Sequence, residues 1–177
     1  MCLAAVLLLL PVPAARAAEG ESIILFRHAI APGVGDPPGV VIGDCSTQRN
    51  LDERGREQAR RIGNALRERG VVAGTVLSSQ WCRARETADL AFPGQVQESP
   101  AFNSFFGNRD SEPRQTAEAR RILLDWKGPG SLLVFTHQVN ISALTGQSTA
   151  SGEGIILRRD GGSLSVIGRI RLDQTAD

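Results

Sequence analysis

Two histidines carry the chemistry that this sequence offers, because its 177 residues contain no other imidazole. Each follows a serine, four apolar residues and one further residue: Ser22 to His28 reads SIILFRH, and Ser131 to His137 reads SLLVFTH. An imidazole with a pKa near 6.5 is largely neutral at pH 7, so either ring could act as a nucleophile, a base or a hydrogen-bond donor. Any imidazole chemistry must therefore use His28 or His137.

Arginines accompany these histidines. Arg27 directly precedes His28, and a third apolar stretch, Thr75 to Leu77, leads to Arg83. Guanidinium groups match phosphate oxygens in a bidentate way. If the three stretches are parallel strands, their carboxyl ends meet at one edge of the sheet, where open α/β sheets bind ligands. A single histidine at a strand end is more often a hydrogen-bonded structural residue, but two in matching positions beside arginines predict an anion site.

The elements that must position these residues alternate along the chain. Short continuous apolar runs alternate with stretches of helical spacing, and two strand-like runs joined by an Asp-Gly-Gly turn end the chain. The expected strands are 22–26, 75–77, 131–135, 154–158 and 163–170, and the expected helices are 51–69, 83–91, 113–126 and 139–144. This order predicts a three-layer α/β/α fold with a mainly parallel sheet and helices on both faces.

Length, composition and charge indicate one folded domain without a polyanionic partner. Hydrophobic residues make up 41% and charged residues 22% of the chain, as in ordinary globular proteins. A chain of 177 residues leaves little room for a second domain. The formal net charge of +1 provides no bulk field for nucleic acid or an anionic membrane. We therefore expect a small-molecule partner and no nucleic acid.

The first 17 residues have the pattern of a signal peptide. Leu3 to Leu10 are all apolar, and Ala15-Arg16-Ala17 has the small-x-small form of a cleavage site. The apolar run is far shorter than the ~20 residues that span a bilayer as a helix. No basic residue precedes it, and a buried N-terminal element is the alternative. We expect residues 1–17 to be removed and residues 18–177 to form a periplasmic or secreted domain without stable membrane insertion.

Cys45 and Cys82 remain in this expected mature chain and favour one disulfide, as in other exported proteins. Two free thiols are the alternative, because sequence does not show whether the two Cα atoms approach closely enough. No pair of cysteines or histidines has zinc-ligand spacing, and a Cys-x-x-Cys redox motif is absent from the sequence. We expect neither a metal nor a cofactor.

Four segments resemble, in order, motifs of the histidine phosphatase (phosphoglycerate-mutase-like) superfamily, and of its small exported branch. These segments are Arg27-His28, Gln48 to Gly55 before the first helix, Ser78 to Ala88 with the second arginine, and Thr136-His137. An Arg-His pair alone is weak evidence, whereas four motifs in the family's order are specific. The resemblance covers nearly all of residues 18–177 and implies a phosphoglycerate-mutase-like fold.

The same resemblance implies a role for each residue. His28 would attack phosphorus and form a phosphohistidine, which water would then hydrolyse. Arg27, Arg83 and His137 would hold the phosphoryl oxygens, and Arg49 matches an extra arginine of the short phosphohistidine-phosphatase branch. The implied activity is metal-independent hydrolysis of a phosphate monoester or anhydride. Some exported relatives act on sugar phosphates of the cell envelope, which makes an envelope sugar phosphate the expected substrate.

One position departs from the family's pattern. Many members have an acidic residue, in a Leu-x-Glu setting, that protonates the leaving group, but the matching stretch here is Phe102-Asn103-Ser104. Either another carboxylate reaches the site, or the leaving group needs no strong acid, as in phosphohistidine, acyl phosphates and anhydrides. The carboxylates nearby in sequence are Asp36, Asp44, Glu98 and Asp110. The departure also keeps open a catalytically inactive phosphate-binding or signalling module of the same fold.

Two further features have two interpretations each. Phe102, Phe105 and Phe106 either line a pocket for an apolar or sugar substrate or cover the core beneath a loop. Asn140, which follows His137 closely, either orients that same loop or caps the following helix. The candidate substrate-binding residues are Arg49, Ser104 and Asn140.

Overall fold

A six-stranded sheet forms the centre of the computed structural model, which describes residues 22–172. The expected signal peptide lies outside these residues. The strand order is β3-β2-β4-β1-β5-β6. The strands are β1 (Ile23–Arg27), β2 (Ala73–Ser78), β3 (Val96–Glu98), β4 (Ser131–Thr136), β5 (Gly154–Asp160) and β6 (Ser163–Ile170). The first four run parallel, and β5 and β6 extend the sheet in antiparallel pairing beyond β1.

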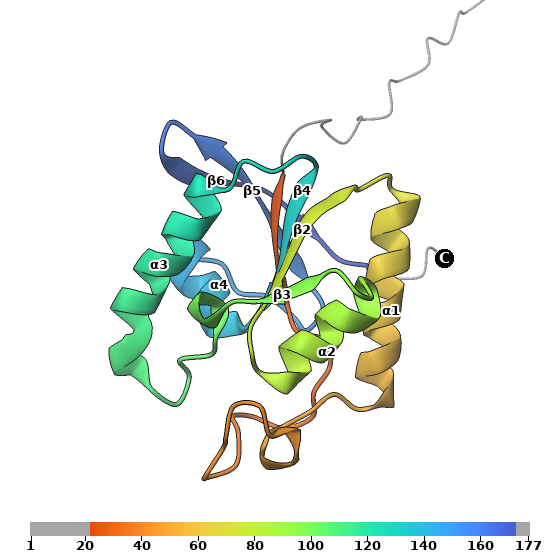
Figure 1. The fold of residues 1–177 in the computed structure, drawn as a ribbon, viewed down its shortest axis with the longest axis vertical. Helices are drawn as coiled ribbons and strands as arrows, with labels where there is room; N and C mark the ends of the chain where they lie inside the picture. The colour runs from red at the N-terminus through yellow and green to blue at the C-terminus, as the bar shows by residue number, and fades with distance from the viewer. Residues whose placement is uncertain (1–21, 173–177) are drawn as a thin grey trace, which may run out of the picture.

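Helices cover both faces of this sheet, as the alternating pattern predicted (Figure 1). The helices are α1 (Glu53–Glu68), α2 (Cys82–Ala91), α3 (Glu112–Asp125) and α4 (Gln138–Thr145), with short 3-10 turns η1 (Cys45–Thr47), η2 (Pro100–Phe102) and η3 (Arg109–Ser111). Helices α1 and α2 share one hydrophobic core with the sheet, and α3 and α4 share the other. The three-layer α/β/α prediction is confirmed. Across residues 22–172, none of the helices has the length and apolarity needed to cross a membrane.

The central strand β4 is buried along its whole length, because β1 and β2 flank it and helices cover both of its faces. Leu132 and Val134 belong to the core beneath α3 and α4, while Leu133 and Phe135 belong to the core beneath α1 and α2. This alternation of buried side chains explains why the strand reads as a continuous apolar run. His137, which directly follows β4, is therefore attached to a well-packed strand.

Helix α1 lies close against the segment that follows β1. Asp52 caps the helix by accepting a hydrogen bond from the backbone N–H of Gly55 at 2.8 Å. A Cβ atom on Gly55 would lie 2.0 Å from the carbonyl oxygen of Ile30, so that only glycine permits this approach. Gln58 of the same helix accepts from the N–H of Ile30 at 3.0 Å. The start of α1 thus fixes the chain immediately after His28.

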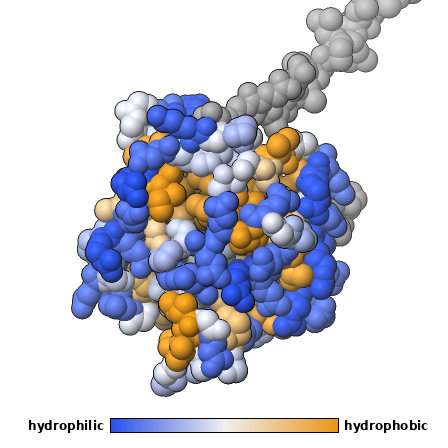
Figure 2. Space-filling model, viewed as in Figure 1, coloured by the Kyte–Doolittle hydropathy of each residue, from blue (hydrophilic) through white to orange (hydrophobic). Residues whose placement is uncertain are grey.

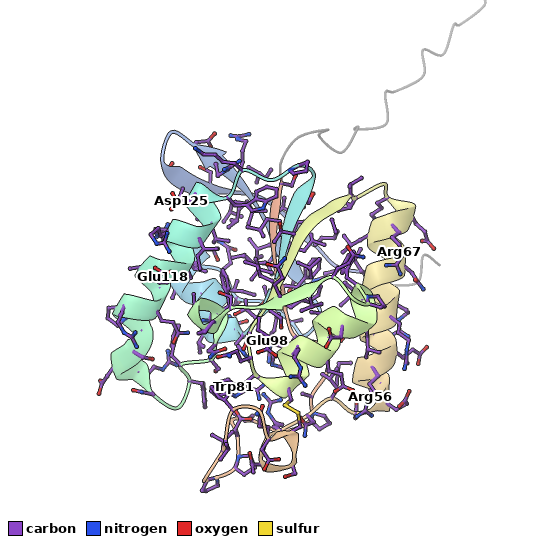
Figure 3. The ribbon with its side chains drawn as sticks, viewed as in Figure 1. Arg56, Arg67, Trp81, Glu98, Glu118 and Asp125 are labelled. Atoms are coloured by element: carbon purple, nitrogen blue, oxygen red, sulfur yellow. A yellow bond between two sulfur atoms is a disulfide. The ribbon has the colours of Figure 1, made fainter. Side chains whose placement is uncertain are left out.

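A long segment between β1 and α1 lies across the carboxyl ends of the parallel strands (Figure 1). Figure 2 shows exposed hydrophobic atoms over this segment, whereas the outer surfaces of α1 and α3 are largely hydrophilic. A disulfide between Cys45 and Cys82 ties the segment to the first residue of α2, with the two Cα atoms 5.7 Å apart (Figure 3). The expected pairing of these cysteines is confirmed.

Reduction of this disulfide should lower the melting temperature. The bridge joins residues separated by 37 positions, and the chain-entropy of such a loop is worth roughly 4 kcal/mol. For a chain of this size that corresponds to a fall of roughly 8–16 °C, measurable by calorimetry with and without dithiothreitol. The Cys45→Ala/Cys82→Ala variant should already show the lower value and no response to reductant. A wild-type melting temperature unchanged by full reduction would contradict this role.

Candidate active site

Both histidines lie at the same edge of the sheet, because β1 and β4 are adjacent and end together. Arg27 is opposite Thr136, so His28 and His137 each directly follow their strand. The backbone N–H of His28 donates to the carbonyl of Thr136 at 2.9 Å and extends the pairing by one residue. The two residues are 2% and 3% exposed, and their ring centroids are 5.5 Å apart. Two imidazoles far apart in sequence are thus neighbours.

A cavity of about 520 Å³ opens beside these rings. The candidate site residues on its lining are Arg27, His28, Arg49, Arg83, Ser104 and His137. Burial lowers the pKa of the three guanidiniums, and the charge of Arg83 lowers those of Arg27 and Arg49 further. Arginine nevertheless stays protonated in proteins. The cavity therefore gathers positive charge that an entering anion would neutralise.

The imidazole of His28 has one nitrogen committed to the backbone and one left free to react. Its Nδ1 lies 2.7 Å from the carbonyl oxygen of Ala29, which can only accept, so Nδ1 carries the ring proton and Nε2 has a lone pair. The N–H of Ala29 donates to Thr87, whose hydroxyl donates to the carbonyl of Arg83. Burial, followed by the charge of Arg83, lowers the pKa of His28 to about 3. The ring is therefore neutral at physiological pH.

Arg27 is held by the loop that precedes β5. Its Nη1 donates to the carbonyl of Thr149 at 2.8 Å. The loop is in turn tied to Glu153, a fully buried carboxylate that accepts from the N–H of Ala150 at 2.8 Å. Arg169 and Arg171 of the last strand and its C-terminal extension pair with the same carboxylate at 2.8 and 3.0 Å. The antiparallel edge of the sheet thus supports one guanidinium of the cavity.

Arg83 is held by a carboxylate from the segment between β1 and α1. Asp36 accepts from Nη1 and Nη2 of Arg83 at 2.6 and 3.0 Å, from the indole N–H of Trp81 at 3.0 Å, and from the N–H of Arg49 at 3.1 Å. Burial alone would raise the pKa of Asp36, but the hydrogen bonds from Arg83 and Trp81 outweigh it and lower the pKa. Asp36 is therefore an ionised anchor rather than a proton donor.

Arg49 completes the group of guanidiniums. Its Nε donates to the carbonyl of Gly35 at 2.7 Å, and its Nη1 donates to the carbonyl of Ala31. Both acceptors belong to the segment that carries Asp36. This segment therefore holds two of the three arginines, and the disulfide at Cys45 fixes it against α2.

Comparison with known proteins agrees with this geometry. The family described as "Histidine phosphatase superfamily (branch 1)" matches residues 23–126. The chain belongs to this superfamily. A curated relative, the mitochondrial serine/threonine-protein phosphatase Pgam5 of Drosophila grimshawi, is 41% identical over 72 residues, which are 41% of this chain and 22% of the relative. The match thus spans about a fifth of the length of that relative.

Two solved structures show the same fold at low identity. The protein histidine phosphatase SixA, complexed with tungstate, has a TM-score of 0.60 and 19% identity, with 84% of this chain and 96% of that chain covered. A phosphoserine phosphatase from Entamoeba histolytica, in complex with 3-phosphoglyceric acid, has a TM-score of 0.62 and 14% identity, with coverage of 87% and 98%. The expected phosphoglycerate-mutase-like fold is confirmed.

Ser104 lies where the family resemblance predicts a proton donor. Ser104 lines the cavity, and its hydroxyl accepts from the N–H of Phe106 at 3.3 Å. Of the four carboxylates considered from sequence, Asp36 alone lines the cavity, where Arg83 binds it. Asp44 caps η1, Glu98 pairs with Arg85 at 3.1 Å, and Asp110 lies within η3. None of these four carboxylates is therefore placed to protonate a leaving group in the cavity.

Glu112 is the other carboxylate on the lining among the described residues, and sequence reasoning missed it. It begins α3 and lies 3.5 Å from Nη1 of Arg109. The sequence signal for it was weak, because an acidic residue before a proline at the start of a helix is ordinary capping chemistry. Within residues 22–172, His, Cys, Asp and Glu side chains form no group of three that could bind a metal ion.

The three phenylalanines divide between the two interpretations. Phe102 and Phe105 are 0% and 1% exposed and cover the core. Phe106 is 50% exposed and lines the cavity, together with the apolar side chains of Val34, Val139 and Ala143. The cavity therefore has a charged part around the histidines and an apolar wall.

Asn140 does not reach this lining. It is buried, and its Nδ2 donates to the carbonyl of Asn103 at 2.9 Å. The bond holds the loop that carries Ser104, as one of the two interpretations expected. Direct contact with substrate has no support in this geometry, because the side chain lies behind the loop.

Replacing Asp36 by asparagine should destabilise the protein and make its stability depend on anions. An amide cannot balance the charge of the buried Arg83, and breaking such a pair costs about 3 kcal/mol. Urea denaturation of Asp36→Asn should show this loss, and added inorganic phosphate should restore more stability to the variant than to the wild type. The exposed Asp44→Asn is the matched control and should behave like the wild type. Equal stability of Asp36→Asn and wild type without phosphate would exclude the anchoring role.

Proposed function

We propose that this chain is a metal-independent phosphatase that hydrolyses a phosphate monoester or anhydride through a phosphohistidine on His28. The observation that carries the proposal is the bare Nε2 of a neutral, buried imidazole in a cavity whose lining includes the guanidiniums of Arg27, Arg49 and Arg83. The three guanidiniums supply the positive charge that a phosphoryl group requires, which leaves a metal ion no necessary electrostatic role. Membership in the histidine phosphatase superfamily supports the same assignment.

The proposed reaction has two displacements at phosphorus. In the first, the lone pair on Nε2 of His28 forms a P–N bond while the bond from phosphorus to the leaving oxygen breaks, and its electron pair departs with that oxygen. In the second, water attacks phosphorus and the P–N bond breaks, which returns neutral His28 and inorganic phosphate. Arg27, Arg83 and His137 hold the equatorial oxygens, where charge spreads in the transition state, and Arg49 adds a further positive charge.

The expected substrate has a leaving group that departs without strong acid assistance. Ser104 replaces the family's acid, Asp36 is committed to Arg83, and Glu112 lies 3.5 Å from Arg109. Phosphohistidine, acyl phosphates and anhydrides meet this requirement, whereas a simple alkyl ester would need a proton donor. The apolar wall around Phe106 suits a leaving group with a hydrophobic or sugar body. Relatives named for phosphorylated serine or histidine support a small phosphorylated group as the substrate's reactive part.

We also propose that the protein is exported, as its N-terminal pattern predicts. A disulfide within the domain supports an oxidising compartment such as the periplasm or the exterior of the cell. An envelope sugar phosphate remains the proposed physiological substrate, and the missing acid requires that its phosphoryl group be attached through a bond that breaks without a strong proton donor.

A catalytically inactive phosphate-binding module is the second candidate. Ser104 favours it, because the site lacks the family's leaving-group acid. Such a module would keep the arginines and bind phosphate without forming a covalent intermediate.

Trapping the intermediate separates the two functions. Radiolabelled acetyl phosphate, an acyl phosphate, should transfer label to the wild type, and the label should survive alkali but not acid, as phosphohistidine does. His28→Ala should carry no label and lose at least ~10³-fold in turnover, while Ser104→Ala should keep the label. Turnover should be unchanged in EDTA.

Different negative results would count against different parts of this proposal. Phosphate binding without label from acetyl phosphate, or from other anhydride donors, would favour the inactive module. Label on Ser104 or loss of turnover in EDTA would contradict the proposed mechanism.

A further inference from the structure

The two histidines of the cavity differ in how their ring nitrogens are bonded. His28 uses Nδ1 to bond the backbone, whereas His137 has Nε2 at 2.8 Å from the hydroxyl of Ser79. Nδ1 of His137 is buried and has no hydrogen-bond partner among residues 22–172. Ser79 lies outside the cavity lining and His137 lies on it, so by elimination we assign Nδ1 as the ring nitrogen that meets a phosphoryl group in the cavity. Whether Nδ1 carries a proton decides what it can bind.

A chain of hydrogen bonds behind Ser79 answers this question. The oxygen Oδ1 of Asn103 lies 2.8 Å from the backbone N–H of Gln80, a group that can only donate. Nδ2 of Asn103 donates to Oε1 of Gln80 at 3.0 Å, which fixes the same amide orientation, and Nε2 of Gln80 lies 3.5 Å from Glu98. Asn103 therefore presents an acceptor to Ser79.

The hydroxyl of Ser79 has one proton, and it donates this proton in a hydrogen bond to Asn103. Its Oγ lies 3.2 Å from Oδ1 of Asn103, and it accepts from the N–H of Trp81 at 3.1 Å. If Ser79 donated to His137 instead, two oxygen lone pairs would face each other, and a proton on Nδ1 would be buried without an acceptor. The arrangement that satisfies Ser79, Asn103 and the ring N–H has the proton of His137 on Nε2, donated to Ser79, and leaves Nδ1 as an acceptor without a donor.

An unprotonated Nδ1 cannot form a hydrogen bond with the oxygens of a phosphoryl group, because both atoms are acceptors and their lone pairs repel. A second proton on the ring removes this conflict, since an imidazolium donates from both nitrogens. We propose that Ser79 is a positioning residue that holds His137 in its Nε2–H form, so that the site binds a phosphoryl group together with one proton. This inference rests on the proposed function, because it assumes that the phosphoryl group lies between the two imidazoles.

The surrounding charges explain why the proton arrives only with the anion. In the empty site, burial lowers the pKa of His137 well below 6.5, and the charges of Arg83, Arg49 and Arg27 lower it further. These groups come from the end of β1, the segment before α1 and the start of α2, and Asp36 is the carboxylate among them. Arg109 of η3 and Glu112 of α3 also line the cavity, where they lie 3.5 Å apart and balance each other's charge. A dianion placed against the same groups reverses the sign of the local field and raises the pKa of His137.

Sulfate is the probe for this proposal, because it has the shape of a phosphoryl group and carries no proton at neutral pH. Calorimetry of the full-length protein at pH 7.5, in buffers of different ionisation enthalpy, should show uptake of about one proton per sulfate. The dissociation constant should rise about tenfold per pH unit above neutrality, as linkage to one proton requires. Tungstate should behave in the same way.

Nuclear magnetic resonance of the imidazole nitrogens gives the direct readout, since the chain has two histidines and the spectrum is correspondingly simple. Without anion at pH 7.5, His137 should be the neutral Nε2–H tautomer. With saturating sulfate, both of its nitrogens should shift to imidazolium values, while His28 stays neutral. A proton on Nδ1 in the anion-free protein overturns the proposal about Ser79, whether or not an anion binds. Failure of any anion to bind is a separate result, and it counts against the proposed phosphatase function.

Ser79→Ala tests the positioning role. Without the hydroxyl the ring can adopt the Nδ1–H tautomer and donate to sulfate directly, so proton uptake and the pH dependence of binding should fall toward zero. Ser78→Ala is the matched control: this neighbouring serine is also buried, but its hydroxyl donates to the carbonyl of Ser79 and not to His137. It should keep the uptake of one proton. Sulfate binding to wild type without proton uptake, or equal uptake in both variants, would overturn the assignment to Ser79.

Discussion

The parallel pairing of β1 with β4 is the constraint on which the site depends. The two strands are adjacent and in register up to Arg27 and Thr136, so each delivers its histidine at the same level of the sheet. A shift of one residue in this register would turn one imidazole toward a helix layer instead of the cavity. Burial on both faces specifies the register, because β4 has apolar side chains toward both cores.

The arginines around this pair of strands must be held close together although their charges repel each other. The guanidiniums of Arg27, Arg49 and Arg83 repel each other, and the structure holds them with backbone carbonyls and with the carboxylate of Asp36. The cavity thus keeps an excess of positive charge in the absence of substrate. Burial, together with that excess, keeps His28 neutral and nucleophilic and disfavours a proton on His137. Anchors for the cavity come from segments far from it in sequence, notably Glu153 with its two arginine partners and the Cys45–Cys82 bridge.

Sequence patterns predicted the parts of the molecule whose burial leaves a periodic trace. The strands ending at Arg27 and Thr136, the four helices and the disulfide follow from apolar runs, helical spacing and cysteine count. Strand β3 was missed, because it is a three-residue edge strand with the exposed, polar Gln97 and Glu98. Resemblance to the family, rather than spacing, indicated the roles of Arg49 and Ser104.

The hydrogen-bond network of the site could not be predicted in this way. The bond from Arg83 to Asp36 crosses 47 positions, and the one from Ser79 to Asn103 crosses 24. No periodicity links such residues, since irregular loops bring them together. For the same reason the sequence left open which phenylalanines line the cavity and which cover the core.

A crystal structure of the protein with tungstate tests the central claim most directly, because the anion reports where a phosphoryl group binds. We predict tungsten next to Nε2 of His28, with its oxygens within hydrogen-bond distance of Arg27, Arg83 and Nδ1 of His137. Tungstate bound away from His28, or bound with His137 turned out of contact, would contradict the account.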